Sequence, residues 1–94
     1  MIAVQTLDCH NLYERNDINS IRLQLTMALI SSYLLRKHYD RVILYTDERT
    51  AEILKDTYYT EFRLLPNNIL VKHGYGTLCK LYTYSNVEEE YIHF

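Results

Sequence analysis

The sequence predicts a small α/β protein whose strands form a mainly parallel sheet in the order β-α-β-α-β-α-β. Short apolar runs rich in β-branched residues recur along the chain, and the run at 42–46 is typical of a strand buried on both faces. Segments with helical periodicity lie between these runs. Alternating strands and helices favour parallel pairing with right-handed crossovers. The 94 residues suit one domain, 1–94.

The first half of the chain predicts a strand at 2–7, a polar loop at 8–16 and a long helix at 17–38. Asn16 or Asp17 is the expected N-cap, and the basic residues 36–38 suit the negative end of the helix dipole. Apolar side chains cover two sides of this helix, so we expect burial against the sheet and also against a second helix, further chain or another subunit. One side contains Ile18, Ile21, Leu25, Ala28, Leu29 and Ser32, and the other contains Leu23, Met27, Ile30 and Leu34.

The second half predicts a strand at 41–46, a helix at 48–56 capped by Asp47, and a third strand around 61–64. Residues 69–71 are apolar but short, and suit either a strand or a buried loop. A helix is expected at 77–86 and a last strand at 91–94.

The net charge, the length of the uncharged runs and the cysteine content exclude several functional classes. A formal net charge of −2 and a pI near 6 give no basic face for nucleic acid. The longest uncharged run, 23–35, has 13 residues, fewer than the about 20 needed to cross a bilayer. Two distant cysteines, Cys9 and Cys79, match no disulfide scaffold, and residues 1–4 lack a basic leader, so we expect a cytoplasmic protein.

Asp47 is the strongest candidate for ligand contact, because it follows a buried strand at the sheet edge where α/β proteins bind ligands. A helix N-cap is an equally sufficient reason for an aspartate there, and the two roles are compatible. Gly74 and Gly76 followed by Lys80 resemble a phosphate loop incompletely, although Lys80 suits an anion at a helix start. No metal site is expected, because the histidines and cysteines lack paired spacing. These are Cys9, His10, His73, Cys79 and His93.

Three segments, 42–47, 80–84 and 91–94, together resemble the N-terminal half of bacterial glycosyltransferase-like proteins of the GT-A type. The resemblance spans essentially the whole chain and implies a Rossmann-like, three-layer fold that binds a nucleotide-sugar. It implies that Thr6, Leu7 and Asp8, with Thr46 and Asp47, face the nucleoside. Lys80 then matches a lysine that begins the helix before the metal-binding strand.

His93 matches a histidine that precedes an Asp-x-Asp motif in such proteins. That motif binds a divalent cation such as manganese, but the sequence ends at Phe94, where its first aspartate is due. We therefore expect a nucleotide-sugar-binding half that is catalytically inactive alone, and assign no catalytic residue. The alternative is a non-catalytic interaction module, a homo-oligomer formed through helix 18–35 or an exposed sheet edge. Ten tyrosines and no tryptophan are compatible with such an interface.

Overall fold

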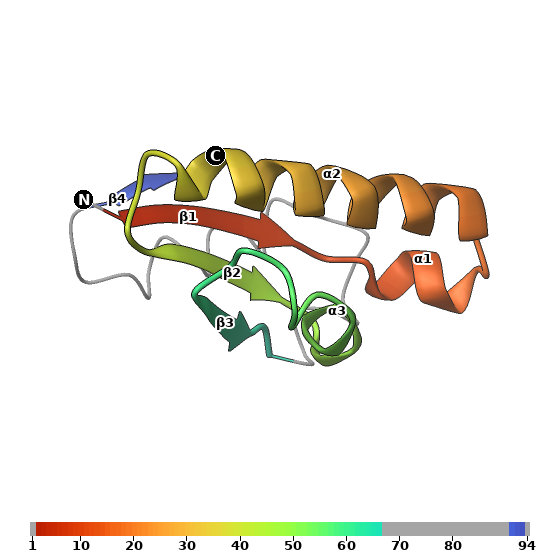
Figure 1. Ribbon diagram of the computed structural model, residues 1–94. Helices are drawn as coiled ribbons and strands as arrows, with labels where there is room; N and C mark the ends of the chain where they lie inside the picture. Colours follow the sequence, from red (N-terminus) through yellow and green to blue (C-terminus); the bar gives the residue numbers. More distant parts are fainter. Residues whose placement is uncertain (1, 67–90, 94) are drawn as a thin grey trace.

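The computed structural model describes residues 2–66 and 91–93, and its centre is a four-stranded sheet (Figure 1). The strands are β1 (Ile2–Leu7), β2 (Val42–Thr46), β3 (Glu61–Leu64) and β4 (Tyr91–His93). All three pairings are parallel, and the order across the sheet is β3-β2-β1-β4. The predicted α/β class with a parallel sheet is confirmed, in an order compatible with a small Rossmann-like unit.

Three helices are described: α1 (His10–Glu14), α2 (Ile18–Arg36) and α3 (Glu48–Ile53). Asp17 and Asp47 are the N-caps of α2 and α3, and their side chains accept from the backbone N–H groups of Ser20 and Thr50. Both helices therefore begin where predicted. They end two and three residues earlier than predicted. Hydrogen bonds that span three residues follow both helices, from the Lys37 N–H to the Leu34 carbonyl and from the Thr57 N–H to the Leu54 carbonyl.

The prediction of a loop throughout 8–16 is wrong, because α1 forms inside it. Asp8 Oδ1 accepts the His10 N–H at 2.9 Å, which starts the turn. His10 Nε2 lies 3.1 Å from Glu14 Oε1 on the same helix face. The helix ends at Glu14, and the turn that follows contains Asn16, whose φ of 52° is left-handed, a conformation that asparagine tolerates. A five-residue helix is marginal alone, so its contacts with α2 and α3 decide that it forms.

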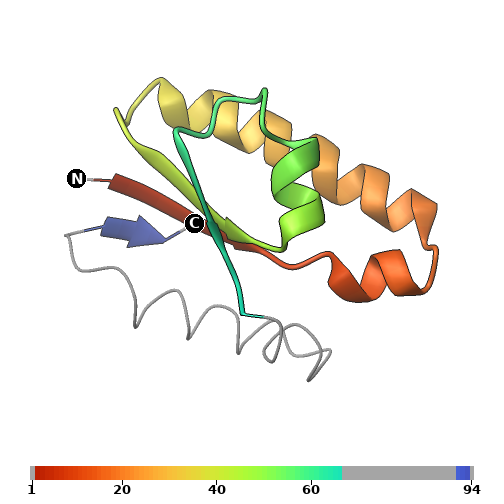
Figure 2. The same cartoon turned by 90° about the horizontal axis from the view of Figure 1, so that it is seen from below.

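The core lies between the sheet and the layer formed by α2 and α3, which lie on the same side of the strands in Figure 2. On the sheet side, the core is formed by alternate residues of β1 and β2, which point to the same face. Ala3 pairs with Val42, and the next pair on this face is Gln5 with Leu44; Ala3, Val42 and Leu44 belong to the buried cluster. From the other layer, Ala28, Leu54 and Tyr59 complete this cluster. The opposite face of the two central strands is also buried, at Val4, Ile43 and Tyr45. Burial on both faces explains the continuous apolar run of β2.

Among the described residues, the first of the two apolar sides predicted for α2 is buried only in part, because Ile18 and Leu29 of that side are 58% and 43% exposed. Ala28 and Ser32 are buried, and Ile21 and Leu25 are half-buried. On the other side, four apolar side chains are each between 51% and 58% exposed, namely Leu23, Met27, Ile30 and Leu34. The segment 69–71, the helix at 77–86 and residue 94 of the last predicted strand lie outside the described residues.

Candidate functional site

The strand order places a topological switch point between β1 and β4. The chain steps from β1 to β2 to β3 in one direction and then returns to place β4 on the other side of β1 (Figure 2). In open parallel sheets, crevices at the carboxyl ends of strands on either side of such a reversal bind ligands. A ligand site is therefore expected at the carboxyl ends of β1 and β4.

At this point β1 extends beyond β4. The described part of β4 pairs only with Ile2–Val4 of β1, so the last three residues of β1, Gln5, Thr6 and Leu7, continue past it. All three line a cavity of about 160 Å³ between β1 and α2. Its remaining lining residues are Gln24, Met27, Ala28, Ser31, Leu44 and Tyr59. The cavity therefore lies beside β1 at the switch point, with its helical wall formed by α2.

The cavity combines apolar walls with several hydrogen-bonding groups. The Tyr59 hydroxyl donates to Gln5 Oε1 at 2.6 Å and lies 3.3 Å from the Ala28 carbonyl oxygen. Burial raises the pKa of Tyr59 well above its usual value, so the phenol stays neutral. Gln24 and Ser31 add an amide and a hydroxyl from α2. The sequence analysis did not single out these residues, because polar residues within a helix and a strand carry no local signal of a shared cavity.

Thr6 and His93 join the two strands at the switch point. Thr6 Oγ1 lies 3.0 Å from His93 Nε2, and both side chains are half-buried. The register explains the contact, because His93 pairs with Val4 and Thr6 is the next residue of β1 on that face. The structure thus brings together two residues from opposite ends of the chain, and a role for either in ligand binding stays a prediction.

Asp47 is buried, with 4% of its surface exposed, and its carboxylate is bonded within the protein. Oδ1 accepts the Thr50 N–H at 2.8 Å, so the predicted N-cap is confirmed. Oδ2 accepts the Thr50 hydroxyl at 2.8 Å and the Cys9 N–H at 3.1 Å. Such donors compensate the cost of burying a carboxylate. Asp47 thereby fixes the loop after β1, and its contact with a ligand stays a prediction.

Thr46 joins the carboxyl ends of β1 and β2. Its side chain is fully buried, and its hydroxyl donates to the Leu7 carbonyl oxygen at 2.5 Å. Leu7 and Thr46 are also partners in the sheet register. Asp8, immediately after β1, is half-buried and accepts from His10 as described. Of the four predicted residues that are described, Thr6 lines the cavity, whereas Asp8, Thr46 and Asp47 do not. Contact of any of the four with a nucleotide stays a prediction.

A group that the sequence analysis missed packs around Asp47. Burial raises the pKa of the Cys9 thiol to about 11, opposed by a hydrogen bond from Thr50 and reinforced by the nearby Asp47 carboxylate. The Tyr13 hydroxyl lies 2.6 Å from Thr50 Oγ1, and burial also raises the pKa of Tyr13. The Arg49 guanidinium lies 4.3 Å from the centre of the Tyr13 ring. The only local signal was Asp8 two residues before a potential helix start, a pattern typical of an Asx turn.

A second polar network lies on the face of the sheet that also carries Thr6. Glu61 accepts from Arg41 at 2.8 Å and from Arg63 at 3.0 Å, and Arg63 donates to the Tyr45 hydroxyl at 2.9 Å. The hydrogen bond from Arg41 is the largest cause that lowers the pKa of Glu61. This network stabilises the β2–β3 edge, because Glu61 and Arg63 pair with consecutive same-face residues of β2.

Several predicted features cannot be placed. Lys80, Gly74, Gly76, His73 and Cys79 lie outside the described residues. Within 2–66 and 91–93, no three side chains of histidine, cysteine, aspartate or glutamate form a group that could hold a metal ion. In the same part of the chain, no helix is long and apolar enough to cross a membrane.

Comparison with models of protein families gives a match over most of the chain. A family model described as "Family of unknown function (DUF6734)" matches residues 6–94. This range includes every described element except the first residues of β1. No curated protein and no solved structure matches the chain.

Proposed function

The chain belongs to the DUF6734 family of unknown function, and we propose that it is a nucleotide-binding domain, the nucleotide-sugar-binding half of a glycosyltransferase-like protein. The observation that carries this proposal is the cavity beside the last three residues of β1, at the switch point between β1 and β4. In Rossmann-like sheets, this position binds the nucleoside and phosphate parts of ligands.

The size and lining of the cavity favour one part of such a ligand. At about 160 Å³ it is smaller than the roughly 300 Å³ at which drug-sized ligand pockets begin, and suits a ribose or a base. Gln5 and Gln24 provide amide groups that pair with base edges or ribose hydroxyls. Thr6, which lines the cavity, and Asp8, in the loop that follows β1, would contact the sugar. Thr46 and Asp47 would hold the loop that carries Asp8. Lys80 is the proposed partner of the diphosphate.

The glycosyltransferase part of the proposal depends on the GT-A resemblance. In such proteins a divalent cation such as manganese neutralises the diphosphate, and we assign no ligand for it among the described residues. We therefore propose recognition of the nucleotide, and no catalytic residue. The free, buried thiol of Cys9 is compatible with the reducing cytoplasm that we propose as the location of this protein.

Titration with UDP and GDP tests nucleotide binding, with and without manganese, by calorimetry and by NMR of the ¹⁵N-labelled chain. We expect amide shifts that saturate at Gln5, Thr6, Asp8, Gln24 and Ser31. The amides of Lys55 and Asp56, which follow α3 and do not line the cavity, are the internal control. Flat calorimetry and unshifted spectra at millimolar nucleotide would exclude the proposed function.

A second role is favoured by a different observation, the exposed apolar side of α2. We propose that the chain also acts as an interaction module that forms a homo-oligomer through this helix. Edge strands provide a further apolar surface, since Leu64 of β3 and Ile92 of β4 are 54% and 38% exposed. A monomeric mass by light scattering throughout the micromolar range would exclude this role.

A further inference from the structure

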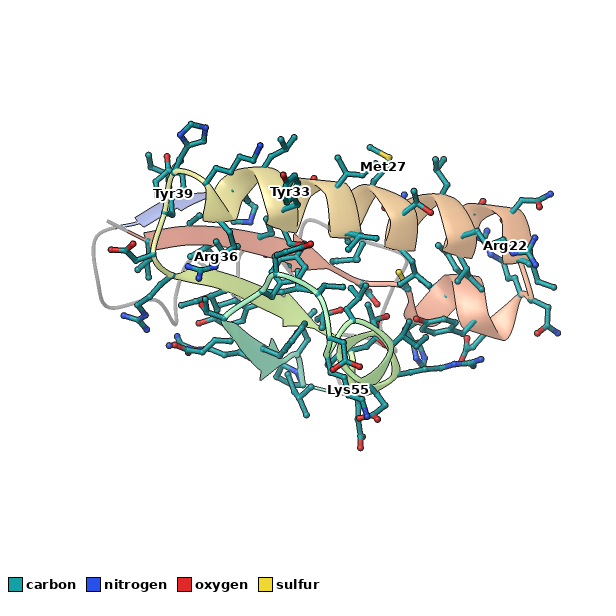
Figure 3. All side chains as sticks on the ribbon, viewed as in Figure 1. Arg22, Met27, Tyr33, Arg36, Tyr39 and Lys55 are labelled. Atoms are coloured by element: carbon teal, nitrogen blue, oxygen red, sulfur yellow. The ribbon has the colours of Figure 1, made fainter. Side chains whose placement is uncertain are left out.

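The exposed side of α2 carries a continuous apolar stripe formed by Leu23, Met27, Ile30 and Leu34. The four residues are spaced by four, three and four positions, which places them on one face of a helix. Figure 3 shows Met27 pointing away from the sheet. Each stripe side chain is more than half exposed, although these residue types are usually buried.

We infer that the partner of this stripe is the α2 helix of a second copy of the chain, packed antiparallel about a two-fold axis between Met27 and Ile30. The spacing four-three-four reads the same in both directions along the helix. A two-fold axis at its centre therefore pairs Met27 with Ile30 of the second copy, and Leu23 with Leu34 of the second copy. Each contact then occurs twice, as an isologous interface requires.

The charges of Asp17 and Lys37 favour the antiparallel direction, whereas Arg22 near the amino end and Arg36 in the last turn oppose it in part. Asp17 and Ser20 lie at the amino end of α2, and Lys37 follows its last residue. Antiparallel packing brings Lys37 of each copy to the amino end of the other helix, near its Asp17 carboxylate. Parallel packing would place Lys37 beside Lys37 and Asp17 beside Asp17. The helix dipoles favour the same choice, because opposite ends meet.

The available area fits a reversible dimer. Four apolar side chains and the flanking Tyr33, each between 43% and 58% exposed, offer on the order of 500 Å² per copy. Two copies together would bury on the order of 1,000 Å², which is the lower bound for a specific interface. We therefore expect dissociation constants on the order of micromolar rather than an obligate dimer. This arrangement rests on the proposed interaction role of α2. It shares one residue, Met27, with the lining of the proposed nucleotide cavity.

Light scattering of the full chain from about 5 to 500 μM tests the association, a range set by that expected affinity. We expect the mass to rise from one to two chains, and Ile30→Asp to keep it at one chain at every concentration. Ile53→Asp is the matched control, because Ile53 is 49% exposed on α3, away from the stripe. Circular dichroism verifies that both variants fold. A monomeric wild type, or an Ile30→Asp variant that still dimerises, would overturn the inference.

Disulfide cross-linking in a Cys79→Ser background tests the direction, because the remaining native thiol, Cys9, is buried. Chains carrying Leu23→Cys and chains carrying Leu34→Cys should cross-link when mixed, and neither should cross-link with itself. In the antiparallel pair, equivalent positions lie roughly 16 Å apart, beyond disulfide range. Cross-linking of Leu23→Cys with itself would overturn the antiparallel arrangement and leave the interaction role intact. A monomer in the scattering experiment would overturn both.

Discussion

The carboxylate of Asp47 accepts the backbone N–H of Cys9 at 3.1 Å across 38 residues of sequence. The same carboxylate caps α3 through the Thr50 N–H. One buried side chain therefore fixes both the loop that leaves β1 and the helix that leaves β2. The position of Asp8, in the loop that follows β1, depends on this connection.

Asp47→Ala should lower the free energy of unfolding by about 2–4 kcal/mol, because it removes a cap and leaves the buried Cys9 and Thr50 donors unpaired. Asp17→Ala is the matched comparison, since Asp17 caps α2 with bonds only to Ser20. Asp17→Ala should lower the free energy of unfolding by about 1 kcal/mol. Urea denaturation measures both values. Equal losses in the two variants would mean that the bond to Cys9 contributes nothing.

Gln24→Trp should weaken UDP binding at least about tenfold, because an indole side chain at Gln24 fills a cavity of about 160 Å³. Thr26→Trp is the control: Thr26 is exposed on the same helix and does not line the cavity. NMR titration of each variant gives the affinity. Unchanged binding in Gln24→Trp would place the nucleotide elsewhere on the protein.

The Glu61 network should stabilise the fold in a pH-dependent way. A carboxylate whose pKa is lowered in the folded state contributes stability that is fully present above its unfolded pKa, about 4.3. That contribution is lost as the pH falls through the lower folded pKa. The pairs are partly exposed, so the effect should be at most about 1 kcal/mol.

Urea denaturation from about pH 6 to pH 2.5, a range that spans that unfolded pKa, measures this dependence. Glu61→Gln should lose less stability than wild type on the acid side. Arg41→Gln should behave similarly, because its hydrogen bond is the largest cause of the lowered pKa. A Glu61→Gln variant with the acid dependence of wild type would contradict this account.

Cys9 should be inert in the folded protein. A pKa of about 11 leaves roughly 100-fold less thiolate at pH 8 than an unfolded cysteine has, and burial excludes reagents further. In the Cys79→Ser variant, a thiol reagent such as DTNB should label the folded chain at least about 100-fold more slowly than the chain in urea. Comparable rates in the two conditions would show that the loop around Cys9 opens readily.

Local sequence patterns were sufficient to predict the described strands and the helices α2 and α3. The apolar run of β2 predicts a strand because a buried strand needs apolar side chains on both faces. Asp17 and Asp47 predict helix starts because a cap bonds to residues only three positions away. The same local logic failed for α1, because a five-residue helix forms only when other parts of the chain pack against it.

The sequence by itself thus determined the two main helix starts, which follow from interactions between near neighbours. It also determined the α/β class and the parallel pairing, which follow from the alternation of strands and helices along the chain. Only the tertiary structure decided that β4 lies beside β1, that Thr6 contacts His93, and that a cavity opens between β1 and α2. It also decided that Asp47 is bonded to Cys9, and that the stripe on α2 stays exposed. These relationships join residues up to 87 positions apart, and such contacts depend on how whole elements pack rather than on any local pattern.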